Sequence, residues 1–148
     1  MRYRGIFVLL GLLPALAFAD VKVEDPWIAE GPPVAQVLGG FMQLRNTDAQ
    51  PRALVGGSST GFARIELHQT VHEDGMAKMV PQERIEVPAQ GTTALQPGGY
   101  HLMLIEPVKP LKAGDTVELT LQFDDGSKQT LQVPVRKRPA HGGHGHGH

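Results

Sequence analysis

The sequence predicts an all-β domain of the antiparallel sandwich or barrel class. Short runs of alternating apolar and polar residues recur along the chain, and turn residues separate them about every 8 to 12 positions. No convincing amphipathic helix interrupts this pattern. A chain of 148 residues can form one such domain with its own core, but not two ordinary ones.

Four strands are expected in the first half of the chain, over 21–28, 34–44, 52–58 and 62–70. Pro26 in the first strand is typical of an edge position. Gly39 and Gly40 in the second strand predict a bulge or a close approach at the glycines. Met42 is expected to fill space in the core beside Phe41.

The second half continues with one or two strands interrupted at Pro81, followed by three more; the ranges are 77–87, 100–106, 116–123 and 128–135. Turns are expected at 46–48, 88–91, 95–99 and 124–127, the last as a hairpin turn. Alternate apolar residues in the last two strands should face the core, because successive strand side chains point to opposite faces. They are Val117, Leu119, Leu121, Phe123, Leu131, Val133 and Val135.

Residues 1–19 have the pattern of a secretory signal peptide. Arg2 and Arg4 precede an apolar run over 6–16, and Ala17-Phe18-Ala19 forms a small-residue cleavage site. The run is shorter than the ~20 residues that span a bilayer, so stable membrane insertion is not expected. The mature chain should begin at Asp20, and its domain should extend over 20–138.

Residues 139–148 form a tail in which histidine alternates with glycine. It contains no residue able to pack, so we expect it to be disordered until it binds something. Its four imidazoles predict a Cu(II) site, although Ni(II) or Zn(II) would also bind such a set. The candidate ligands are His141, His144, His146 and His148.

Charge and composition exclude several functions. Without Arg2 and Arg4 the 14 basic side chains become 12, against 15 acidic ones, so the mature balance is −3 and nucleic-acid binding is not indicated. The sequence has no cysteine, which rules out a disulfide framework or a thiolate metal site within these residues. No nucleophile, base or carboxylate pair is apparent, so an enzyme is not expected.

A pair of metal-binding side chains lies in the predicted strand over 100–106. His101 and Met103 flank Leu102, and residues two apart on a strand share a face about 6.6 Å apart. Met103 therefore lies away from Leu102 and Leu104, whereas a core methionine would lie with them. The same alternation over 62–69 predicts that His68 points outward.

Imidazole nitrogen and thioether sulfur together form a soft, neutral ligand set. Such a set favours Cu(I) over cations that prefer oxygen, and over Zn(II). Met79 follows the turn-rich stretch 72–75 and adds a second thioether. Met76 and His72 are interpreted as loop residues, and only Met79 has the spacing described next.

Ten residues separate His68 from Met79, twenty-one separate Met79 from His101, and one separates His101 from Met103. This H-x10-M-x21-H-x-M pattern resembles the signature of the periplasmic copper chaperone family PCu(A)C. The resemblance covers about 21–135 and extends to other segments. These are 57–59, 65–68, 73–76, 97–103 and 110–116.

The resemblance implies a cupredoxin-like Greek-key fold and one Cu(I) held by His68, Met79, His101 and Met103 in the periplasm. The site would lie on turns and strand ends at an exposed end of the sandwich. The implied acceptor is the binuclear copper centre of cytochrome c oxidase, in its subunit II, with Sco-like thiol proteins on the same route.

Two other functions use similar chemistry. Passive copper sequestration for resistance would use the same ligands without delivery. Electron transfer by a cupredoxin is disfavoured, because a blue-copper site is built on a cysteine thiolate and the sequence has no cysteine.

Overall fold

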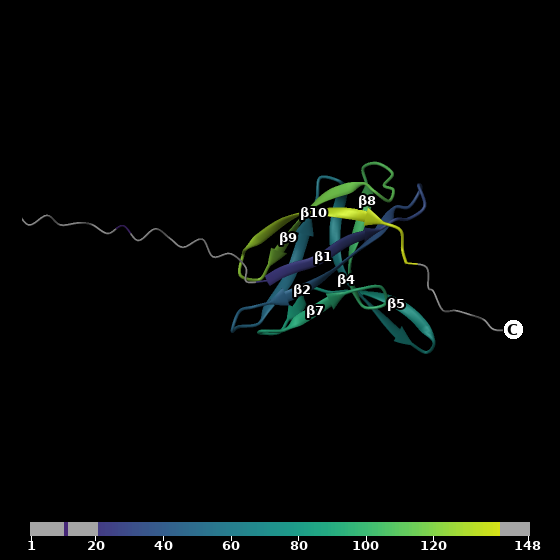
Figure 1. Ribbon diagram of the computed structural model, residues 1–148. Helices are drawn as coiled ribbons and strands as arrows, with labels where there is room; N and C mark the ends of the chain where they lie inside the picture. Colours follow the sequence, from purple (N-terminus) through teal and green to yellow (C-terminus); the bar gives the residue numbers. More distant parts are fainter. Residues whose placement is uncertain (1–10, 12–20, 140–148) are drawn as a thin grey trace, which may run out of the picture.

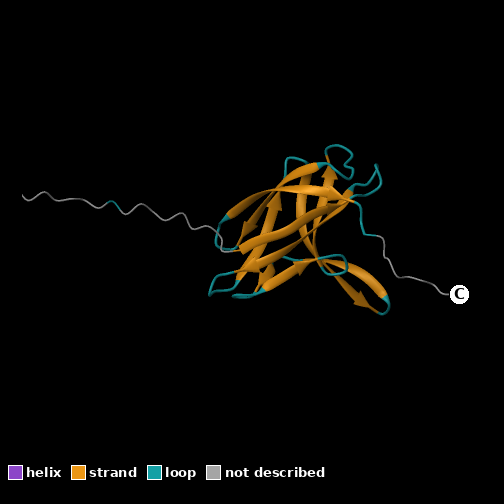
Figure 2. Ribbon diagram, viewed as in Figure 1, coloured by secondary structure: helices purple, strands orange, loops and turns teal. Residues whose placement is uncertain are grey.

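The structure is a computed structural model that describes residue 11 and residues 21–139. Within that part of the chain ten strands are present and no helix occurs (Figure 2), so the predicted all-β class is confirmed. None of the described residues forms a helix long and apolar enough to cross a membrane. Apart from Gly11, the predicted signal peptide lies outside the described residues, as do the four tail histidines.

The strands follow one another without intervening helices. They are β1 (Val21–Ala29), β2 (Val37–Asn46), β3 (Arg52–Ser58), β4 (Phe62–Glu73), β5 (Met76–Pro81), β6 (Ile85–Val87), β7 (Thr92–Leu95), β8 (Tyr100–Pro107), β9 (Thr116–Phe123) and β10 (Lys128–Arg136).

All ten strands belong to one mixed sheet in the order β5-β4-β8-β7-β2-β1-β10-β9-β3-β6, and β8 also pairs with β2 (Figure 1). The pairs β1–β10 and β7–β8 are parallel, which local alternation cannot predict. Core side chains from β9 and β10 pack in one cluster with those of β2, β4 and β8. The sheet therefore closes over a single core, as a sandwich does.

The alternation that predicted the last two strands matches the burial of their side chains. Val117, Leu119, Leu121 and Phe123 are all buried, and so are Val133 and Val135 of β10, while Leu131 is half-buried. Met42 is buried in the same core. Gly126, with φ of 84°, occupies the expected hairpin turn between β9 and β10.

Three local features differ from the predictions. Strand β2 begins at Val37 rather than at 34, and β7 lies over 92–95, where no strand was predicted. The glycines mark a close approach rather than a bulge: a Cβ on Gly39 would lie 2.8 Å from Phe41 Cζ. The irregular pairing lies instead in β1, between Glu24 and Trp27.

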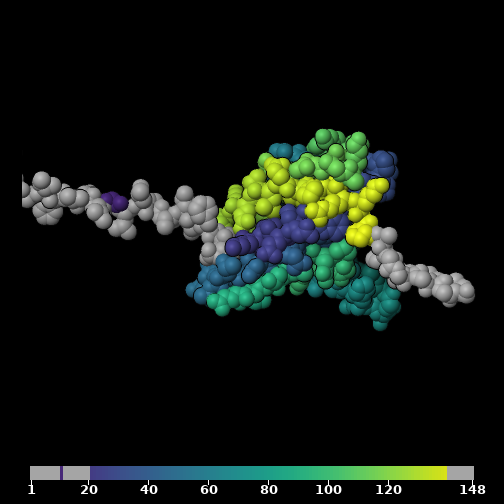
Figure 3. All heavy atoms as spheres, viewed as in Figure 1, coloured from purple at the N-terminus to yellow at the C-terminus, as the bar shows by residue number. Residues whose placement is uncertain are grey.

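Strands β4 and β5 form a hairpin that projects from the body of the domain (Figure 3). Its turn consists only of Asp74 and Gly75, with φ of 52° and 74°, as a two-residue turn of type I′ requires. His72 and Met76, which were expected in a loop, therefore lie in strands. The short turn extends the paired part of the hairpin to its tip.

Leu119→Ala should lower the free energy of unfolding by about 2–5 kcal/mol, because the side chain is fully buried and its removal leaves a cavity. Equilibrium unfolding in urea measures this change. Gln122→Ala, on the exposed face of the same strand, is the matched control and should stay within about 0.5 kcal/mol. Equal effects of the two substitutions would contradict the orientation of β9.

Candidate metal centre

The register of three neighbouring strands places the four predicted ligands on one face of the sheet. His68 of β4 pairs directly with His101 of β8, while Met79 pairs with Thr70 and Met103 pairs with Glu66. Directly opposed residues share a face, and so do residues two apart on a strand.

His68 is the centre of this arrangement. Met79 and Met103 occupy the two diagonal positions beside it, one on each neighbouring strand. Diagonal neighbours in a sheet are about 7–8 Å apart, within reach of long side chains. Two flexible thioethers can therefore meet over the pair of imidazoles.

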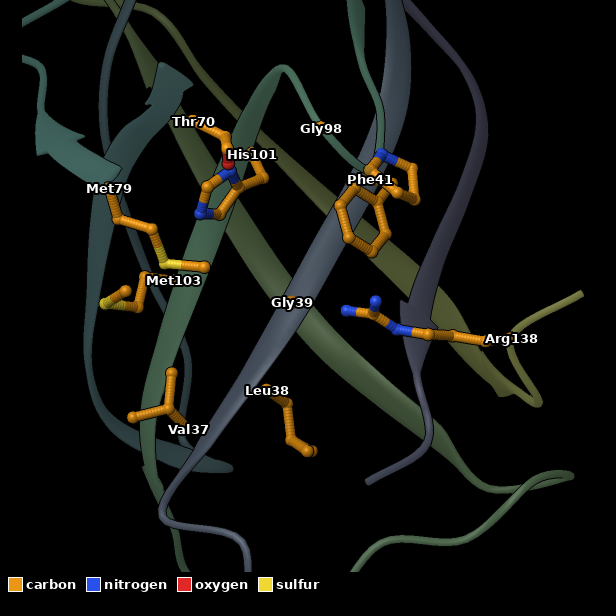
Figure 4. A pocket seen from close by; sticks show the side chains of 11 residues that line it. Val37, Leu38, Gly39, Phe41, Thr70, Met79, Gly98, His101, Met103 and Arg138 are labelled. Carbon is orange, nitrogen blue, oxygen red and sulfur yellow. The ribbon is translucent and has the colours of Figure 1, made fainter. Parts of the chain in front are cut away.

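A cavity of about 530 Å³ opens on this face, and Met79, His101 and Met103 all line it (Figure 4). Gly39 of β2 pairs with Met103 and also lines the cavity; a Cβ there would lie 2.8 Å from Phe41 Cζ, so the glycine leaves room for the Phe41 ring. His68 does not line the cavity, but its ring is stacked against that of His101 with 6.0 Å between the centroids.

The burial of the ligands differs from the predictions. His68 and His101 are each only 6% exposed, although His68 was predicted to point outward. It does lie on the face opposite the buried Leu67, but neighbouring groups cover that face: His101 stacks on His68, and Phe41 lies 6.4 Å from the His101 ring. The expected site on turns and strand ends is thus wrong, since His68 lies within β4.

Each histidine uses one ring nitrogen in a hydrogen bond to an acceptor. His68 Nε2 lies 2.9 Å from Glu66 Oε2, and His101 Nδ1 lies 3.1 Å from the Gly99 carbonyl oxygen. A carbonyl and an ionised carboxylate only accept, so these two nitrogens carry the hydrogens. In neutral imidazoles the lone pairs then lie on His68 Nδ1 and His101 Nε2.

Those two remaining nitrogens are buried and have no hydrogen-bond partner. An unsatisfied buried polar atom costs about 1–3 kcal/mol, so native structures seldom retain one without a reason. An imidazole whose other nitrogen donates to a carboxylate or a carbonyl is also the usual form of a metal-binding histidine. The donor set therefore fits a metal ion bound at these nitrogens.

Glu66 stabilises the form of His68 that carries its hydrogen on Nε2. The hydrogen bond from His68, followed by that from Arg64, holds the pKa of Glu66 below its ordinary value. Arg64 Nε lies 3.1 Å from the second carboxylate oxygen. Sequence reasoning missed this role, although the i, i+2 spacing of Glu66 and His68 places both on one face.

The chemistry of the donors limits which metal could bind. Among the described residues no three His, Asp or Glu side chains converge in a metal-binding group. A metal on this face would therefore depend on thioether sulfur, which favours Cu(I) over oxygen-seeking cations. Met76 cannot replace Met79, because it pairs with Glu73 and projects from the opposite face of the hairpin.

The two histidine tautomers can be measured. At about pH 8, long-range ¹H–¹⁵N spectra should show His68 protonated on Nε2 and His101 on Nδ1. Glu66→Ala should convert His68 into a mixture of tautomers and leave His101 unchanged. The same tautomer on both histidines in the original protein would contradict the hydrogen-bond assignment.

Comparisons with known proteins agree with the fold. The chain is 35% identical to the "Putative lipoprotein Lxx21020" of Leifsonia xyli subsp. xyli, over 87% of this chain and 84% of the relative. It is 34% identical to the Cu(I)-bound protein DR1885 of Deinococcus radiodurans, with a TM-score of 0.64 over 84% of this chain and 83% of that one.

The copper-bound PCuAC domain of PmoF2 has a TM-score of 0.68 over 82% of this chain and 96% of that domain; at 23% identity, this likeness shows the fold alone. The cupredoxin-like β fold is thereby confirmed. A family model described as "Putative lipoprotein LpqE-like" matches residues 21–135. The chain therefore belongs to the LpqE-like family, and its predicted kinship with the PCu(A)C proteins is confirmed.

Proposed function

We propose that this protein is a copper chaperone that holds one Cu(I) between His68, Met79, His101 and Met103 and passes it to another protein. The observation that carries the proposal is the pair of unpartnered, buried imidazole nitrogens on one sheet face, flanked by two thioethers. The similarity to a protein solved with Cu(I) bound supports the choice of metal.

Two features of the site support this proposal. The hydrogen bonds from His68 to Glu66 and from His101 to Gly99 fix the rings in place, so little side-chain freedom is lost on binding. Thioethers are neutral and need no deprotonation, so only the imidazoles compete with protons for the metal. Met79 is 59% exposed and is the ligand that an acceptor can displace first.

The ligand set can be tested by titration with Cu(I) under strong reductant, in competition with a chromophoric chelator. His101→Ala and Met103→Ala should each weaken Cu(I) binding by more than about tenfold, since even supporting groups around a metal are worth 10–100-fold. Met76→Leu is the control, because Met76 projects from the other face of the hairpin. Unchanged binding in both ligand variants would refute the proposed site.

We also propose that His141, His144, His146 and His148 bind Cu(II) and hold it close to the core site. Arg138, which directly precedes the tail, lines the cavity and reaches toward Gly39 in Figure 4. The 13 residues after Val135 could extend about 45 Å at most, which is long enough to reach the core site. A tethered donor raises the local concentration of metal.

Deletion of residues 141–148 should remove one equivalent of Cu(II) and leave Cu(I) binding unchanged. Titration of the full and shortened chains under oxidising and then reducing conditions measures both. Loss of both equivalents on deletion would refute the two-site arrangement.

The acceptor we propose is the binuclear copper centre in subunit II of cytochrome c oxidase, with Sco-like proteins on the same route, in the periplasm. Passive sequestration is the alternative and requires the same ligands. A transfer assay separates them: a chaperone delivers copper to an apo acceptor faster than copper moves through free solution. Electron transfer is disfavoured by the absence of cysteine, and the role is one of binding rather than catalysis.

A further inference from the structure

The four proposed ligands differ in their exposure. Both histidines are buried and Met103 is half-buried, whereas Met79 is largely exposed on the edge strand β5. Met79 is therefore the ligand that an arriving or departing ion can reach from solvent. One route to it runs along the projecting β4–β5 hairpin.

His72 lies on that route. It is two residues beyond Thr70 and four beyond His68 on β4, so it projects from the same face as the proposed ligands. It pairs with Ala77, which makes it a diagonal neighbour of Met79, at the usual spacing of about 7–8 Å. The His72 side chain is exposed.

No other soft donor in the described residues could serve this role. Beyond the four proposed ligands, the described part of the chain contains only His72, Met42 and Met76 as histidine or methionine. Met42 is buried in the core, and Met76 projects from the opposite face of the hairpin. Of these three residues, only His72 shares a face with Met79.

We propose that His72 and Met79 form a second, transient Cu(I) position at the outer part of the hairpin, through which copper enters and leaves the site. This inference rests on the proposed function. Met79 belongs to both positions, so the ion keeps its bond to that sulfur while a bond to the His72 nitrogen replaces those to His68, His101 and Met103. Copper stays Cu(I) throughout, and no electron is transferred.

Shared ligation changes the rate of exchange more than the resting affinity. The inner position has four donors and two fixed imidazoles, while the outer one has two donors on an exposed hairpin. At equilibrium the ion therefore resides in the inner position. Loss of His72 removes the outer position and leaves the four ligands of the inner position intact.

The test uses the full chain loaded with one equivalent of Cu(I), with a strong chromophoric Cu(I) chelator in excess and stopped-flow detection. His72→Ala should slow copper removal by roughly tenfold, the scale typical of losing one group that supports a metal ligand. Stoichiometry and affinity at equilibrium should stay within about twofold of the unmodified chain, because the four inner ligands remain. All variants keep the tail, so its contribution is common to them.

The matched control exchanges two neighbouring residues. The double substitution His72→Glu with Glu73→His keeps composition and charge but moves the imidazole to the opposite face, because Glu73 pairs with Met76. It should be as slow as His72→Ala. Glu73→Gln should remain as fast as the unmodified chain, since the exposed Glu73–Lys78 pair contributes little.

Three outcomes would overturn the inference. Removal rates equal to those of the unmodified chain in His72→Ala would show that copper does not pass this residue. Copper removal from the double variant at the rate of the unmodified chain would show that the face on which the imidazole lies does not matter. A loss of equilibrium affinity above about tenfold in His72→Ala would make His72 a resident ligand. Absence of Cu(I) binding by the unmodified chain would instead refute the proposed function itself.

Discussion

The register between β4 and β8 is the constraint on which the site depends. Side chains alternate along a strand, so a slip of one residue would exchange the two faces of β4. Leu67 pairs with Leu102, and both are buried, while the adjacent His68 and His101 pair on the other face. Burial of a leucine contributes about 1.5–3 kcal/mol, and a slipped register would expose these side chains. The hydrophobic core therefore fixes the alignment of the imidazoles.

The second contribution comes from groups outside the proposed ligand set. Glu66 and the Gly99 carbonyl orient the two rings, and each leaves one nitrogen free on the same side of the sheet. The two free nitrogens are buried, and a buried polar atom without a partner raises the free energy of the folded state. The unpartnered nitrogens His68 Nδ1 and His101 Nε2 therefore lower the stability of the fold locally. Burial of the core offsets this loss, and a bound ion would remove it.

Local sequence patterns predicted the parts of this arrangement that depend on alternation within one strand. The shared face of His101 and Met103, opposite Leu102, is of this kind, and so is the inward face of β9. Burial of His68 could not be predicted in the same way, because it depends on His101 of β8, which is distant in sequence. Strand β7 has only four residues, two of them threonines, too few to establish a periodicity.

The length of the turn between β4 and β5 was predicted wrongly for a different reason. The polar stretch 72–75 suggested a long turn, but an Asp-Gly pair can reverse the chain alone when both residues adopt positive φ. The position of the Phe41 ring beside the cavity likewise depends on Gly39, where a Cβ would clash with that ring. Sequence spacing predicted the donors, whereas the pairing of strands determines their surroundings.

Strand β5 ends the sheet, so one row of its backbone amides and carbonyls has no neighbouring strand. Such a margin invites self-association, and three features oppose it: β5 is only six residues long, Lys78 adds a charge, and Pro81 lacks an amide hydrogen. In the proposed function copper would pass along this same edge, which must therefore stay accessible while resisting edge-to-edge pairing of strands. The short length of β5, the charge of Lys78 and the missing amide hydrogen of Pro81 leave this edge accessible to other molecules and disfavour its pairing with a second copy of the chain.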